Sequence, residues 1–143
     1  ACQKQAITPA MTGDEKEELG ILVFDVTSAP ANFVAEQGDV LAKFLKVTAD
    51  ANAMWADEAN HAKMLPVIAK DAGMDEDATA STLATFIFPT VEEQLSAKWL
   101  GGGAQSFMKG VADVFVNAGS IDAALDSYAG TVNLAPLTAA SGM

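Results

Sequence analysis

The stretch Gly20-Ile-Leu-Val-Phe-Asp25-Val-Thr-Ser-Ala-Pro30 decides the expected fold. Its apolar run over residues 21–26 is typical of a β-strand and carries a carboxylate, Asp25, near its end. Ser28 and Pro30 are typical of a helix start. An acidic side chain between a strand and a new helix is a common element of small-molecule sites at a sheet edge. A lone strand leaves backbone groups unpaired, so the sequence predicts that this strand has neighbours.

Composition and charge restrict the function classes. The chain has 143 residues, of which 50% are hydrophobic, and its formal net charge is −11. All of its cations are lysines, so nucleic-acid binding is disfavoured and bidentate phosphate capture is weakened. No uninterrupted apolar run approaches the roughly 18 residues that a membrane span needs. The single cysteine, Cys2, permits no internal disulfide. Because no initiator Met is present, we expect a further segment upstream of Ala1.

Beyond the strand, the apolar spacing predicts helices separated by Gly and Pro. Gly73 is expected to end one helix, Asp75-Glu-Asp77 to begin the next, and Thr90-Val-Glu-Glu93 to form a capping box. We expect a lead-in over 1–19 that is irregular apart from a short acidic helix at 14–18, a main region over 20–134 and a tail over 135–143. The expected helices of the main region cover residues 31–37, 40–57, 60–72, 75–86, 90–100, 104–118 and 120–128. Residues 130–143 are expected to be extended. The prediction is thus a mainly helical segment with one or two strands.

No motif predicts catalysis, a cofactor or a metal. Glu58-x-x-His61 has the spacing of half a di-iron site, but a second copy is missing, so a cluster at a helix end is favoured. Asp75-Glu-Asp77 lacks the remaining ligands of a calcium loop. Gly101–Gly103 lacks the ending of a phosphate loop, which favours helix punctuation over an anion cradle.

Asp25 is the strongest candidate for a ligand-binding residue. A carboxylate at the end of an apolar strand is costly without a partner. Two interpretations remain open: Asp25 caps the following turn, or it accepts hydrogen bonds from a ligand's ammonium or hydroxyl group. Ser28 is a weaker second candidate. Together with the free N–H groups of the helix at Pro30, it would hold an anionic group nearby.

Several stretches, in this order, resemble one known family. They are Thr12-Gly-Asp-Glu with Gly20, Phe24-Asp-Val26, Asn32-Phe-Val-Ala-Glu36, Phe44-Leu-Lys-Val-Thr48 with Asp50-Ala51, Phe88-Pro-Thr90 with Glu92-Glu-Gln94, Lys98-Trp-Leu-Gly-Gly102, and Gly119 with Asp126-Ser-Tyr128. Together they resemble the C-terminal part of the taurine/sulfonate substrate-binding proteins of ABC importers. The resemblance runs from about Thr12 to Leu134.

The resemblance implies an α/β chain, the C-terminal part of a two-lobed type 2 periplasmic-binding-protein fold. Residues 20–134 would then hold a hinge strand and helices of the first lobe, and the N-terminal half of the same protein would supply the other strands. Asp25 would bind the ammonium of taurine or of a related small sulfonate or amine. Leu19 and Thr27-Ser-Ala29 depart from the family pattern, which leaves the solute's identity open.

The implied protein is a non-enzymatic solute carrier of the periplasm that closes around its solute and delivers it to an ABC permease. The alternative is a stand-alone helical interaction module that dimerises or pairs its strand with a partner.

Overall fold

The computed structural model describes residues 15–16 and 23–143, and this part of the chain is helical. It contains no β-strand and no sheet, so the predicted α/β fold of a type 2 periplasmic-binding-protein segment is wrong. Within the expected strand, residues 23–26 have no ladder partner, and residues 21–22 lie outside the described residues. The physical reason is that a strand needs a neighbour for its backbone bonds, whereas helices satisfy theirs locally.

The helices of the first half lie close to their predicted positions. Gly73, at φ +67, ends one of them in the left-handed conformation that glycine adopts readily. The Asp75 carboxylate begins the next by accepting a hydrogen bond from the Ala78 amide at 2.8 Å. The elements are α2 (Ala31–Glu36), α3 (Gly38–Ala56), the 3₁₀ turn η1 (Glu58–Asn60), α4 (His61–Ala72) and α5 (Glu76–Leu83).

The second half departs further from prediction. Its elements are α6 (Val91–Leu95), α7 (Gly103–Asn117), the 3₁₀ turn η2 (Ala129–Thr131) and α8 (Ala135–Ser141). Helix α6 ends five residues before the predicted Leu100, and residues 120–128 form no helix. The expected extended tail instead contains α8, in which Pro136 occupies the first turn. The Asn133 side chain supports this start by accepting a bond from the Ala135 amide at 3.0 Å.

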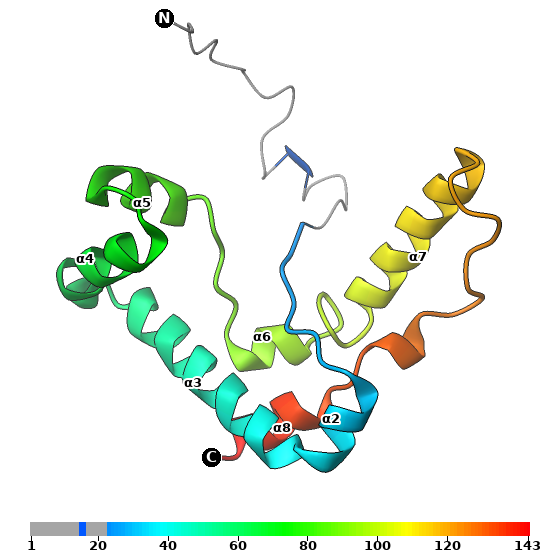
Figure 1. Cartoon of the computed structure of the whole chain (residues 1–143), viewed down its shortest axis with the longest axis horizontal. Helices are drawn as coiled ribbons and strands as arrows, with labels where there is room; N and C mark the ends of the chain where they lie inside the picture. Colours follow the sequence, from blue (N-terminus) through cyan, green and yellow to red (C-terminus); the bar gives the residue numbers. More distant parts are fainter. Residues whose placement is uncertain (1–14, 17–22) are drawn as a thin grey trace, which may run out of the picture.

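The helices form two arms that rise from a shared base (Figure 1). At the base, α8 packs against α3 and α6, and α2 packs against α3. One arm continues along α3 to the packed pair α4 and α5. Helix α7 forms the other arm, and none of the other described helices makes an extended contact along it.

The buried core consists mainly of small side chains. The buried hydrophobic residues are Ala42, Ala69, Ala104, Ala112, Leu137 and Ala140. Among the described residues no large side chain is fully buried, while Phe44, Phe115 and other bulky apolar groups are exposed. Burial of such groups away from water is favourable, so these faces are suited to further contacts.

Within the described chain no helix combines the length and apolarity that crossing a bilayer requires.

Candidate functional site

The segment that carries Asp25 is held by one aromatic side chain. Phe24 makes edge contacts with Trp99, at a centroid distance of 6.3 Å, and with Phe107 of α7, at 5.8 Å. Contacts of this kind add about 0.5–1.5 kcal/mol beyond area burial. Segment 23–30 is therefore positioned by side-chain packing, in place of the strand pairing that the sequence predicted.

Asp25 and Ser28 are both exposed on this segment. Ser28 does not cap α2: the N-cap residue is Pro30, and no side chain donates or accepts there. The first alternative for Asp25, a capped turn, also has no hydrogen bond to support it among the described residues.

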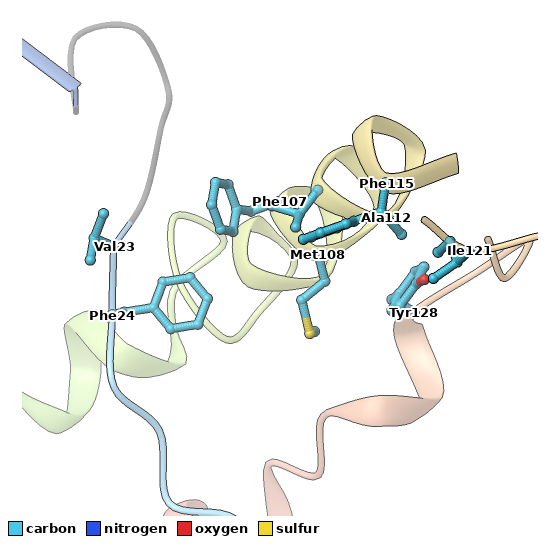
Figure 2. Close-up of a pocket in the computed structure, with 9 residues that line it drawn as sticks. Val23, Phe24, Phe107, Met108, Ala112, Phe115, Ile121 and Tyr128 are labelled. Atoms are coloured by element: carbon cyan, nitrogen blue, oxygen red, sulfur yellow. The ribbon is translucent and has the colours of Figure 1, made fainter. Parts of the chain in front are cut away.

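The two residues before Asp25, Val23 and Phe24, line an apolar groove along α7, which we call the α7 groove. It has a volume of about 700 Å³. Its lining residues are Val23, Phe24, Phe107, Met108, Val111, Ala112, Phe115, Ile121 and Tyr128. Figure 2 shows Phe24 directed toward α7 from one side, with Tyr128 and Ile121 on the far side.

The electrostatic character of the groove is simple. The Tyr128 hydroxyl is the only side-chain polar group among the lining residues. Lys109 of α7 donates to the Asp113 carboxylate at 2.6 and 2.8 Å, so this pair contributes little net charge. Asp25 follows the lining residue Phe24, and Asp122 follows Ile121. The groove is thus apolar inside, with carboxylates adjacent to it along the chain.

The sequence pattern identified part of this groove. The spacing in 104–118 predicted an amphipathic helix, and its apolar residues Phe107, Met108 and Val111 now line the groove. Ile121 and Tyr128 were assigned to a helix that does not form. No local signal placed them opposite Phe24, because that placement depends on the path of the chain after α7.

The triple glycine beside the groove acts as a tight connection, as the punctuation hypothesis predicted. The amides of Gly101, Gly102 and Gly103 all donate to carbonyls of residues 96–99, so they do not form an anion cradle. A Cβ on Gly101 would lie 2.7 Å from the Leu95 and Ser96 carbonyl oxygens. A Cβ on Gly103 would overlap the Lys98 carbonyl. Glycine is required here by the close approach of two backbones.

The other polar motifs complete helix ends. Asn60 Nδ2 donates to the Met54 carbonyl at 2.9 Å, and His61 Nε2 lies 2.7 Å from the Trp55 carbonyl oxygen. The His61 ring also stacks on Trp55 at 4.0 Å. These contacts confirm the prediction of a helix-end cluster, because they satisfy the last carbonyls of α3. Asp75 is the N-cap of α5, as described above.

The predicted capping box of α6 is also present. The Thr90 hydroxyl accepts from the Glu93 amide at 3.2 Å, and the Glu93 carboxylate accepts from the Thr90 amide at 2.7 Å. The hydrogen bonds from the Thr90 amide and hydroxyl lower the pKa of Glu93 from its usual 4.5.

No group of three or more potential metal-ligating side chains occurs in the part of the chain that is described.

The fold and this site define a helical protein with an open apolar groove. No protein-family model, no curated protein and no solved structure matches the chain.

Proposed function

We propose that this chain belongs to a non-enzymatic, periplasmic solute-binding component of an ABC importer. Its solute would be taurine or a related small sulfonate or amine. The ordered resemblance of the stretches between Thr12 and Leu134 supports this proposal.

The observation that carries the proposal is the position of Asp25. Its carboxylate is exposed and directly follows Val23 and Phe24, two residues of the α7 groove. A hydrogen bond between an ammonium group and a carboxylate contributes about 1.5–3 kcal/mol. Ser28, three residues further on, is the second candidate contact. The packing of Phe24 on Trp99 and Phe107 would hold both residues in place.

Another part of the same protein completes the site in this proposal. A zwitterion needs a partner for its anionic group, and the groove itself offers only the Tyr128 hydroxyl. We propose that the N-terminal half of the same protein supplies that partner and covers the α7 groove. Closure of the two parts around the solute would create the form that the ABC permease recognises. This chain alone is therefore expected to bind taurine weakly or not at all.

Titration calorimetry with taurine tests the proposal on the protein that carries both halves. We expect heat of binding from the complete protein and a loss of about tenfold or more in affinity for Asp25→Asn, as removal of one charged hydrogen bond predicts. The matched control is Asp39→Asn, which changes the charge equally at an exposed position of α3. Equal affinity of the parent and Asp25→Asn would refute the role of Asp25, and no taurine binding by the complete protein would refute the taurine proposal.

The exposed apolar faces also support the alternative, a stand-alone helical module that associates with a protein partner or with itself. The version of this alternative in which the module pairs a strand with its partner has no support, because the described residues contain no strand. A complete protein without taurine binding, together with stable association of this chain, would favour the module.

A further inference from the structure

We propose that α3 carries a self-association surface on which two copies of this chain form an antiparallel helix pair. The surface, which we call the α3 stripe, consists of Val40, Phe44, Val47, Ala51 and Met54. These residues are separated by alternating steps of four and three, the spacing of the apolar seam in a coiled coil. All five are exposed, and Val47 retains 68% of its accessible surface.

The opposite face of α3 is already covered within the chain. Ala42 is buried to 2% exposure, and α8 packs against α3. In the heptad that places the stripe at positions a and d, Ala42 falls at f, on the far side of the helix. Small residues thus allow the close approach of α8, and the bulky residues Phe44, Val47 and Met54 remain on the free side.

The charge of α3 permits a second copy to approach. The chain as a whole carries −11, which would keep two copies apart over most of the surface. Within α3, however, Asp39 and Asp50 are balanced by Lys43 and Lys46. The helix therefore presents an apolar stripe without net charge, so two α3 helices meet without strong local repulsion.

The positions of these charges select the antiparallel arrangement. In the heptad, Phe44 and Ala51 are at a, Val40, Val47 and Met54 are at d, and Lys43 and Asp50 are at g. An antiparallel register with Phe44 against Val47 and Val40 against Ala51 places Lys43 opposite Asp50 of the second copy. A parallel pair would instead bring these g residues against e residues, Thr48 and Trp55, and would form no ion pair.

Asp50 has room for this additional partner. Its oxygens accept from Lys46 Nζ at 2.6 Å, and its side chain remains 58% exposed. A carboxylate offers about four acceptor positions, so Lys43 of the second copy can bind beside Lys46. Helix α3, which carries the stripe, lies in the arm opposite α7 (Figure 1). Self-association therefore goes beyond the proposed function and needs no solute.

Sedimentation equilibrium over a range of protein concentrations tests the surface. We expect a concentration-dependent dimer of the parent chain and a loss of about tenfold or more in association for Phe44→Asp with Val47→Asp. The matched control is Val67→Asp, because Val67 of α4 is 67% exposed and lies outside the stripe. Circular dichroism establishes that each variant keeps its helix content. A monomer at every concentration, or equal weakening by the control, would overturn the proposal.

Charge reversal tests the orientation. Lys43→Glu and Asp50→Lys, each alone, are expected to weaken the dimer about threefold to tenfold, because each places like charges opposite one another. The double variant, Lys43→Glu with Asp50→Lys, is expected to recover association because the two charges exchange places. A double variant weaker than both single variants would overturn the antiparallel register.

Discussion

The α3 and α7 arms show how side-chain size decides which helices pack together. Both helices are amphipathic and rich in apolar residues, but within the described chain only α3 has a second helix packed extensively against it. Small side chains are buried on both of these helices, Ala42 of α3 and Ala140 of α8, together with the larger Leu137 of α8. On α7 the bulky residues Phe107, Met108 and Phe115 face the groove, where Phe24 is the nearest aromatic anchor. Close approach of backbones therefore requires small side chains, and the bulky faces are left for other contacts.

The largest expected effect is a loss of stability where α8 packs against α3. Leu137→Ala removes the one bulky buried side chain of α8 and is expected to lower the free energy of unfolding by about 2–3 kcal/mol, toward the low end for a buried leucine. The matched change on the other arm is Val114→Ala, at a side chain that is 65% exposed, where we expect less than about 0.5 kcal/mol. Urea unfolding followed by circular dichroism measures both. Equal effects would show that the two arms do not differ in packing.

A second prediction concerns the connection that sets the direction of α7. Gly103→Ala forces a Cβ into the Lys98 carbonyl and is expected to cost about 1–3 kcal/mol. Gly110→Ala, within the same helix, places its Cβ in open space and is expected to stabilise the protein by about 0.5–1 kcal/mol. Thermal unfolding should show a lower midpoint temperature for Gly103→Ala and a higher one for Gly110→Ala, each relative to the parent chain. Midpoint shifts in the same direction for both variants would contradict the close backbone approach at Gly103.

The smallest expected effect concerns α6, which lies between the arms. The folded state holds the pKa of Glu93 below its usual 4.5, so the ionised carboxylate favours the folded form. This contribution is present above about pH 4.5 and is lost as the pH falls through the lowered value. Carbon-detected NMR titration of the Glu93 carboxyl group should show the lowered midpoint.

Two variants give the controls for that titration. In Thr90→Ala the hydroxyl contacts of Glu93 are removed, so its midpoint should move toward the usual value. Glu92→Gln, outside the capping box, should leave the Glu93 midpoint nearly unchanged. An unshifted midpoint in the parent chain would contradict the capping box as the cause.

The sequence predicted the local features of the fold well. The capping box at Thr90 and Glu93, the cap at Asp75 and the left-handed stop at Gly73 are all present. Each depends on residues within about four positions along the chain, which is the range over which helix caps act. The helix-end contact of His61 with Trp55 spans six positions and is local as well.

The errors concern contacts between distant segments. The run at 21–26 has strand-like composition, but its described residues find no second strand, and Phe24 packs on Trp99 instead. Residues 120–128 contain helix-forming residues, yet such a short helix is marginal without a packing surface. The reverse holds for α8, because its contact with α3 stabilises seven residues that looked extended.

The sequence by itself determined where most helices begin and end and the negative charge of the chain. It also determined the apolar faces of α3 and α7. Only the tertiary structure decided which face of α3 is covered by α8, that segment 23–30 is anchored by Phe24, and that Ile121 and Tyr128 border the α7 groove. The physical reason is that caps and turns depend on bonds between near neighbours. Coverage of an apolar face depends on which distant segment has side chains small enough to approach it.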